Sequence, residues 1–370
     1  MKKTIILITA ILLTPSFQKR CASCSAQGMG VNISGAMADS SALLDADATG
    51  MNPKKGMLIP RMNTTERNAI VSPALSLLIY NTDCNVFQSW DGSRWSSLLS
   101  YVQLPGAFPN NITFNYTGSI QSWTVPANTC WVKIKVWGAG GGGACVTFSN
   151  PTHPAGGGAG YAEALVKVFP GDVLSIYTGG NGSGCVGTPA GGWGYGSGGS
   201  GGTGTNNGGG GGGGSAVLLN GNVILVAGGG GGGGGTGTNS SIAGGYGGSG
   251  GGTNGETLFG AGGVAGASTN TNGTAGQNHP IAGGGGAGGG GGGLNGGTGG
   301  SLNSSFGSSA GGGGGGKNFS NYLNASYKFK SGIGVIPGNS TDPDLCAGCA
   351  VGGTAGSSTG GGNGFIKIYY

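Results

Sequence analysis

Hydrophobic and polar residues alternate most clearly from Trp131 to Trp137. Val132, Ile134 and Val136 fall on one face of an extended chain, while bulky or charged residues occupy the other. This period of two predicts a β-strand with one face in a hydrophobic core. Similar patterns predict further strands at 112–116, 121–125, 161–169, 173–177 and 365–370. The C-terminal part of the chain is therefore expected to be a mainly β domain.

A hairpin is predicted where Asn220-Gly221-Asn222 separates two apolar segments, 216–219 and 223–227. Residues 223–226 are apolar on both faces, which predicts a buried strand. Residues 318–336 contain less glycine than their surroundings, and we interpret them as a long surface loop.

The N-terminal part has the pattern of a small α+β module. Asn63 followed three residues later by Glu66 predicts a capped helix that begins at Thr64 and ends near Ile70. Short apolar segments at 77–80 and 87–90 predict strands, and each is followed by turn residues. We place this module at 27–100, a proline-containing linker at 101–110 and the glycine-rich β-domain at 111–370.

The first 26 residues have the pattern of a signal peptide. Two lysines precede a short apolar segment, and small residues follow near Ala26. That segment is too short to span a membrane, so we expect a secreted or cell-surface protein that is not membrane-spanning. Four of the 16 basic residues lie in this segment, which leaves 12 against 11 acidic residues, and we expect no nucleic-acid partner.

Glycine accounts for 95 of the 370 residues, and most of it lies between Gly138 and Gly362. Such a tract is disordered, collagen-like or a packed bundle of polyglycine-II helices. Collagen requires a strict Gly-X-Y repeat, which this tract lacks. Disordered segments are usually rich in charge, whereas between Lys167 and Lys317 the charged residues are Asp172 and Glu256. The low charge favours the packed bundle.

Six cysteines follow the predicted signal peptide, and in an oxidising compartment they could form three disulfides. Cys145 and Cys185 both follow predicted strands, and we favour their pairing. Cys346 and Cys349 have the spacing of half a zinc site, but no second pair completes it. A local disulfide between them is the preferred interpretation.

Residues 55–70, 77–83 and 90–95 carry three motifs in order. They are Lys-Gly-hydrophobic-Pro-Arg-Met with a following Arg-x-Ala-Ile, then Leu-Leu-Ile-Tyr-Asn-Thr-Asp, then Trp-Asp-Gly-Ser-Arg-Trp. This stretch, about 28–99, resembles a module common in secreted bacterial surface proteins. In that family the module precedes tail-fibre-like or other adhesive domains, which implies a carrier or oligomerisation role. A homotrimer is the expected assembly.

A second set of motifs spans about 108–370. It opens with Trp-Thr-Val-Pro-Ala before a strand that ends in Trp-Gly-Ala-Gly-Gly-Gly-Gly, and it closes with Gly-Gly-Asn-Gly-Phe-Ile-Lys-Ile. The region resembles bacterial and phage glycine-rich domains, including tail-fibre tip adhesins and the glycine-rich region of anaplastic lymphoma kinase-type receptors. The resemblance implies a polyglycine-II helix bundle inserted into a β-sandwich or jelly-roll-like scaffold, with binding loops.

Isolated aromatic residues among the glycines are the candidate ligand contacts. They are Trp193, Tyr195, Tyr246, Phe259 and Phe306, together with His279. Aromatic side chains on a rigid scaffold suit recognition of sugars or proteins. The alternative is that they fill the ends and sides of the glycine bundle.

Sequence motifs for chemistry are weak. Gly311–Gly316 with Lys317 lacks the hydroxyl residue of a phosphate-binding loop, and Asp342-Pro-Asp344 is interpreted as a turn rather than a metal site. No catalytic, cofactor-binding or metal-binding residues are therefore assigned. We expect a non-enzymatic, adhesin-like surface protein that binds an extracellular glycan or protein. The alternative is a structural matrix or spacer protein without a specific ligand, and an enzyme is a third hypothesis.

Overall fold

The computed structural model describes residues 28–97, 108–146, 154–238, 245–252, 255, 262–268, 270–280, 284–302, 313, 315–316, 318–320, 327–356 and 360–370. The predicted signal peptide, 1–26, and residues 101–107 of the predicted linker lie outside them. The chain divides into two compact units, Met1–Leu98 and Leu99–Tyr370. The described residues are mainly β, with several sheets and one five-residue helix, which confirms the predicted mainly β class.

The first unit contains two small sheets. Strands β1 (Met29–Val31) and β2 (Leu44–Ala46) form a parallel pair. Strands β3 (Arg61–Met62), β4 (Leu78–Asn81), β5 (Val86–Trp90) and β6 (Trp95–Ser97) form a second sheet in that order.

Helix α1 (Thr64–Asn68) begins at the predicted cap. Asn63 Oδ1 accepts from the Glu66 N–H at 2.9 Å, and Glu66 Oε2 accepts from the Asn63 N–H at 2.9 Å. These two bonds satisfy N–H groups that the first helical turn leaves free. The helix ends two residues before the predicted Ile70.

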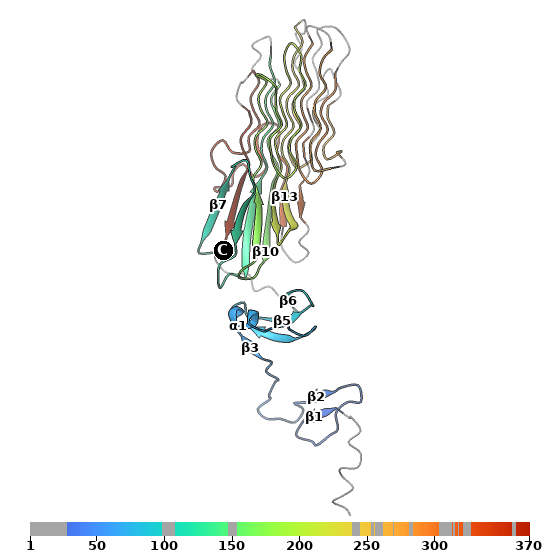
Figure 1. Cartoon of the computed structure of the whole chain (residues 1–370), viewed down its shortest axis with the longest axis vertical. Coiled ribbons are helices and arrows are strands. Elements are labelled where there is room, and N and C mark those ends of the chain that lie inside the picture. Colours follow the sequence, from blue (N-terminus) through green and yellow to red (C-terminus); the bar gives the residue numbers. More distant parts are fainter. Residues whose placement is uncertain are drawn as a thin grey trace, which may run out of the picture. The chain divides into compact units, whose positions relative to one another are not determined.

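The second unit is built on two five-stranded antiparallel sheets (Figure 1). One has the order β15-β10-β9-β16-β7, and the other has the order β14-β13-β12-β11-β8. The first comprises β15 (Tyr327–Lys330), β10 (Tyr161–Lys167), β9 (Trp131–Trp137), β16 (Phe365–Tyr369) and β7 (Asn111–Asn115). The second comprises β14 (Phe319–Ser320), β13 (Asn222–Ala227), β12 (Ser215–Leu219), β11 (Val173–Tyr177) and β8 (Gln121–Thr124).

Both sheets contribute to one hydrophobic core. Val132, Ile134 and Val136 of β9 are fully buried there, as their alternation predicts, together with Leu174 and Ile176 of β11. Strands β12 and β13 pair on either side of Asn220-Gly221, which confirms the predicted hairpin. The interpretation of 318–336 as a surface loop is wrong in part, because β14 pairs with β13 and β15 pairs with β10.

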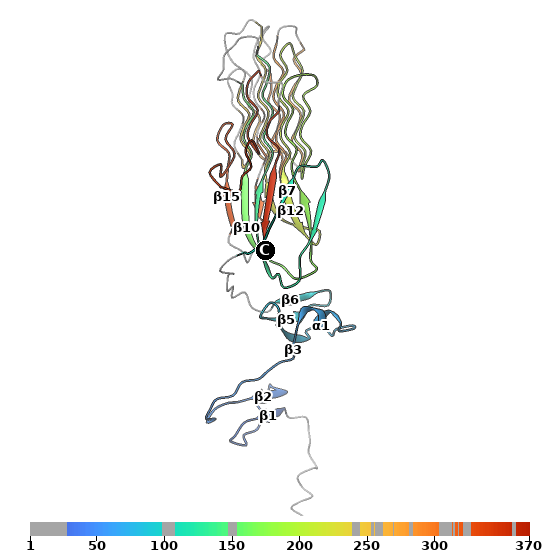
Figure 2. The ribbon, with the colours of Figure 1, turned by 90° about the vertical axis from the view of Figure 1, so that its left-hand side faces the viewer.

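Glycine-rich segments continue from the ends of the strands and lie beside one another (Figures 1 and 2). Residues 208–214 and 228–235 are buried throughout, although they are neither helix nor strand. The Gly228 N–H donates to Asn318 Oδ1 at 2.8 Å, and the other backbone N–H groups donate to carbonyl oxygens of other glycine-rich segments. The backbone of these glycine runs can be buried because these hydrogen bonds satisfy its polar groups.

The partners of 208–214 repeat every third residue. Gly209 and Gly212 donate to one neighbour, at Gly233 and Gly230 respectively. Gly210 and Gly213 donate to a second neighbour, at Ser183 and Gly180. Gly208, Gly211 and Gly214 donate to a third, at Gly202, Gly199 and Gly196. The N···O distances are between 2.8 and 3.0 Å. One segment is thus joined to three neighbours, each along its own side.

Candidate functional site

Two of the predicted ligand contacts meet in an aromatic cluster at the start of the glycine-rich region. The cluster consists of Tyr116, Tyr177, Trp193 and Tyr195. The ring centroids of Tyr177 and Trp193 lie 6.0 Å apart at an interplanar angle of 14°. Tyr195 meets Tyr177 edge-on at 5.5 Å, and Tyr116 lies 6.3 Å from Trp193. Three separate segments therefore bring four rings together.

The local chain explains these positions. Tyr177 is the last residue of β11, and Tyr116 directly follows β7. Trp193 is held by its carbonyl, which accepts from the Gly180 N–H at 2.6 Å. A Cβ on Gly180 would lie 2.7 Å from the Tyr116 ring, so the absence of a side chain there admits the tyrosine.

All four rings of the aromatic cluster are half-buried, so each offers part of its surface to solvent. Burial, followed by the neighbouring Tyr177, raises the pKa of the Tyr195 hydroxyl. A tyrosine hydroxyl is ordinarily protonated at neutral pH, and the raised pKa moves its ionisation further away, so it is a hydrogen-bond donor. The site combines ring faces with a neutral hydrogen-bond donor, and this combination suits binding.

Among the described residues, Tyr246 and His279 take no part in the ring contacts of the aromatic cluster. Tyr246 is half-buried between buried glycines, and His279 is half-buried with its ring packed on Gly284. Phe259 and Phe306 lie outside the described residues. Sequence reasoning placed Tyr116 and Tyr177 in strands and missed them as site residues. The available signal was that each stands where a strand ends.

Both predicted cysteine pairs lie at disulfide distance. The Cα atoms of Cys145 and Cys185 are 5.2 Å apart, and those of Cys346 and Cys349 are 5.4 Å apart. The first pair joins two glycine-rich segments 40 residues apart in sequence. The second pair lies in the turn that follows Asp344.

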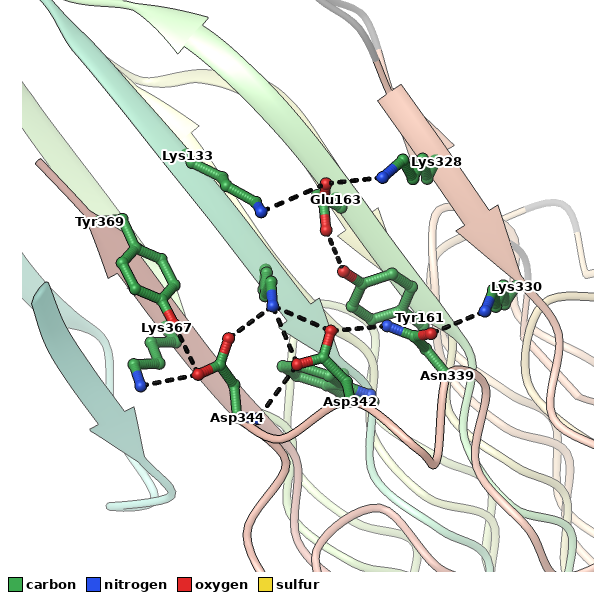
Figure 3. A network of polar contacts seen from close by, with 12 residues as sticks. Lys133, Tyr161, Glu163, Lys328, Lys330, Asn339, Asp342, Asp344, Lys367 and Tyr369 are labelled. Atoms are coloured by element: carbon green, nitrogen blue, oxygen red, sulfur yellow. Dashed lines mark hydrogen bonds and ion pairs between the residues drawn. The ribbon is translucent and has the colours of Figure 1, made fainter. Parts of the chain in front are cut away.

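A polar network covers the outer face of β9, β10 and β16 (Figure 3). Lys135 Nζ donates to both Asp342 oxygens at 2.9 Å and also to Asp344. Lys367 Nζ donates to Asp344 at 2.8 Å, and the Tyr369 hydroxyl donates to the same carboxylate. The segment that contains both aspartates is thereby fixed to two strands.

Burial and pairing set the pKa values in this network. Burial alone would raise the pKa of Asp344, but hydrogen bonds from Lys135, Lys367 and Tyr369 outweigh it and hold the pKa well below its ordinary value. Burial also opposes the charge on Lys135, yet its bonds to Asp344 and Asp342 raise its pKa. Two ammonium groups thus neutralise two carboxylates.

A second part of the network surrounds Glu163. Its carboxylate accepts from the Tyr161 hydroxyl and lies 3.8 Å from Lys133 Nζ and 3.5 Å from Lys328 Nζ (Figure 3). Burial, followed by the bond to Glu163, raises the pKa of Tyr161. The carboxylates of both parts are paired with lysines or tyrosines, so the network can fix segments together.

Within the described ranges, no group of three or more His, Cys, Asp or Glu side chains could hold a metal ion. Asp342 forms a turn, in which its N–H donates to the Asn339 carbonyl at 3.0 Å and its Oδ1 accepts from the Asp344 N–H at 3.0 Å. Among the same residues, no helix has the length and apolar character needed to cross a membrane.

Residues 30–115 match a family model described as a phage tail like trimerisation region. No curated protein matches the chain. The matched residues begin within β1 and extend through β7, so they cover nearly all of the stretch, about 28–99, that resembles a module common in secreted bacterial surface proteins. The match agrees with that resemblance for this part of the chain.

Proposed function

We propose that this chain is a structural protein of the tail-fibre kind, in which an N-terminal region joins copies into a homotrimer and a glycine-rich domain acts as an adhesin. One observation carries the proposal. The hydrogen-bonded lattice of buried glycine segments supports a half-exposed aromatic cluster beside the two sheets. A rigid scaffold that positions aromatic rings is the usual basis of a binding surface.

The glycine lattice is proposed to consist of polyglycine-II helices. That helix has three residues per turn and no internal hydrogen bonds, so its N–H groups point outward in three directions. The return of each donor to the same neighbour at every third residue supports this geometry. The two five-stranded sheets with their common core support a sandwich scaffold, and a jelly-roll-like connectivity is part of the same proposal.

Secretion and a non-enzymatic role complete the proposal. The predicted signal peptide and two cysteine pairs at disulfide distance support an oxidising compartment outside the cytoplasm. The neutralised carboxylates of the polar network support a structural use of the most strongly perturbed groups. The homotrimer is supported by the match to a trimerisation region.

The ligand is proposed to be a glycan or protein of a cell surface, contacted by Trp193 and Tyr195. The test is binding of the purified full chain to glycan and whole-cell panels. We expect saturable binding that Trp193→Ala weakens by on the order of tenfold, because a contact aromatic is a typical hot spot. Tyr246→Ala tests the second predicted contact. Trp131→Ala is the matched control, since Trp131 is a half-buried tryptophan on β9 outside the aromatic cluster.

Absence of saturable binding across the panels, or equal binding by Trp193→Ala and the wild type, would contradict the adhesin. The second candidate is a matrix or spacer protein without a specific ligand. It is favoured by the packing of the aromatic rings on one another and on Gly180, as expected of residues that fill the side of a bundle. This candidate predicts self-association without saturable ligand binding.

A further inference from the structure

The segment from residue 28 to residue 58 has an ordered backbone but no core of its own. Every one of its residues is exposed or half-buried. Leu43 is 82% exposed, Leu58 77% and Met37 72%, and Met29, Val31, Ile33, Leu44 and Met57 are also exposed large apolar residues. Isolated exposed apolar residues are ordinary, whereas eight within 31 residues are a concentration that a partner could cover.

The two paired strands of this segment have no other described element packed on their faces. Strands β1 and β2 pair in parallel through Met29–Leu44, Gly30–Asp45 and Val31–Ala46. Parallel strands in proteins are nearly always covered on both faces, and an isolated two-stranded pair is at best marginally stable in water. All the residues of β1 and two of the three in β2 are exposed. Something outside the described chain is therefore needed to cover the pair.

The polar groups of the segment would not oppose burial of its apolar side chains. Asp39 accepts from the N–H and the hydroxyl of Ser41 at 2.8 and 2.6 Å. Asp47 accepts from the Thr49 N–H at 2.8 Å, and Asp45 from the Asp39 N–H at 3.0 Å. These carboxylates already have partners within the segment, so an apolar partner would not leave them without a hydrogen bond.

The neighbouring sheet of the same unit differs. In β3–β6, Ile79 and Trp95 are buried, and Arg67 Nη1 donates to the buried Gln88 Oε1 at 2.9 Å. This part of the unit exposes Val71, Leu75 and Phe87, but unlike residues 28–58 it also buries large side chains. Eight of the eleven exposed large apolar residues described in the first unit therefore lie before residue 59.

We propose that residues 28–58 form the surface through which copies of this chain join, and that the β1–β2 pair is buried only in that assembly. The inference rests on the proposed homotrimer and locates its interface. A second copy is the occupant because the segment lies almost wholly within the residues that match a trimerisation region. Its apolar residues can meet their equivalents around a symmetry axis. The β3–β6 sheet then serves as a connection rather than as the interface.

The test is size-exclusion chromatography with light scattering on the full chain. We expect a trimer for the wild type and a monomer for the double variant Leu43→Ser/Leu58→Ser, because both leucines are lost from the apolar surface. Ile333→Ser is the matched control, since Ile333 is 79% exposed but belongs to the second unit, and it should remain a trimer. Circular dichroism verifies that the variants keep their sheets, since no substituted residue contributes to a described core.

Amide hydrogen exchange gives a second readout that needs no variant. The Met29 N–H donates to Leu43 O and the Asp47 N–H to Val31 O, and we expect their protection to fall as the wild type is diluted into monomers. A trimer that persists in the double variant overturns this interface but leaves the homotrimer standing. A wild type that is monomeric at all concentrations overturns both this interface and the homotrimer. Coverage of residues 28–58 by the second unit of the same chain would give that result. Ligand binding is measured separately and is decided by Trp193→Ala.

Discussion

At the scale of single residues, the polar network shows how two buried ion pairs connect distant parts of the chain. Lys135 and Asp342 are 207 residues apart in sequence, and both side chains are about 9% exposed. A buried charge is costly unless it is paired and hydrogen-bonded. Here Asp342 accepts from Lys135 and from the Asn339 amide, and Asp344 accepts from Lys135, Lys367 and the Tyr369 hydroxyl. The Trp137 Nε1–H also donates to the Gly338 carbonyl at 2.9 Å. The segment 338–344 is therefore fixed at several points.

The stability of the second unit should fall in acid because of Asp344. Its pKa is lowered in the folded state, so its contribution is present above the unfolded value of about 4 and is lost as the pH falls toward the folded pKa. We expect the urea midpoint of the wild type to decrease below about pH 4, and Asp344→Asn to flatten that decrease while lowering the midpoint at pH 7. Asp172→Asn, which alters a different turn, is the control. An acid slope unchanged in Asp344→Asn would refute the assignment.

Sequence reasoning could not find this network. Asp342-Pro-Asp344 was correctly interpreted as a turn, and Lys135 was assigned to the face of its strand opposite the core. Nothing in the local pattern indicates that the two meet, because the contact depends on the path of the chain through the whole glycine-rich region. The same holds for Tyr116 and Tyr177, whose neighbours in the aromatic cluster come from a segment without periodicity.

At the scale of elements, the glycine segments replace strands and helices as the repeating unit. A Cβ on Gly212 would collide with the Ala139 carbonyl, while its N–H donates to Gly230 at 2.8 Å and its carbonyl accepts from the Gly292 N–H at 2.9 Å. The close approach of neighbouring backbones therefore requires glycine at this position. Propensity alone would not favour it, since glycine loses the most backbone freedom on ordering.

Gly212→Ala is expected to destabilise the second unit by roughly 3 kcal/mol or more, since overpacking a site bounded by backbone forces several segments apart. Gly187→Ala is the control. Gly187 has a φ of +75° and open space around it, so alanine there costs only backbone strain of about 1–2 kcal/mol. Thermal unfolding of the two variants compares these costs. Equal melting temperatures would mean that residues 208–214 are not packed as described.

The strands were more predictable than the segments between them. The alternation at 131–137 and the Asn220-Gly221 turn are local signals, and both gave the correct element. Strands β14 and β15 lie in a stretch of mixed composition, and they form because β13 and β10 offer free edges. Which strand edges are free depends on the assembled sheet, so the local sequence pattern cannot predict it.

At the scale of the whole molecule, the two units differ in how they acquire a core. The second unit has two buried clusters, one between its sheets and one around Trp137 and Tyr161. Much of the first unit lacks one, which is why its assembly with other copies is proposed. Composition indicated the glycine-rich unit, and motifs indicated the N-terminal one, but the uncovered surface became evident only from the structure.

Limited proteolysis tests the packing of the larger unit. We expect thermolysin to leave a fragment of about 111–370 intact, because Leu219 packs against the main core and the adjoining glycine runs are buried. Trypsin cannot serve, since no lysine or arginine lies between Lys167 and Lys317. Mass spectrometry identifies the products, and unfolded protein is the positive control for cleavage. Rapid cutting of the folded chain at Leu218 or Leu294 would indicate an open tract.

The return of the Gly208–Gly214 donors to the same neighbour at every third residue also limits how this run can change in length. Insertion of one residue would turn every later donor in the run toward a different neighbour, whereas insertion of three would restore the phase. Length variants of such a run should therefore be tolerated best when the run gains or loses three residues, because only that step returns every later donor to its own neighbour.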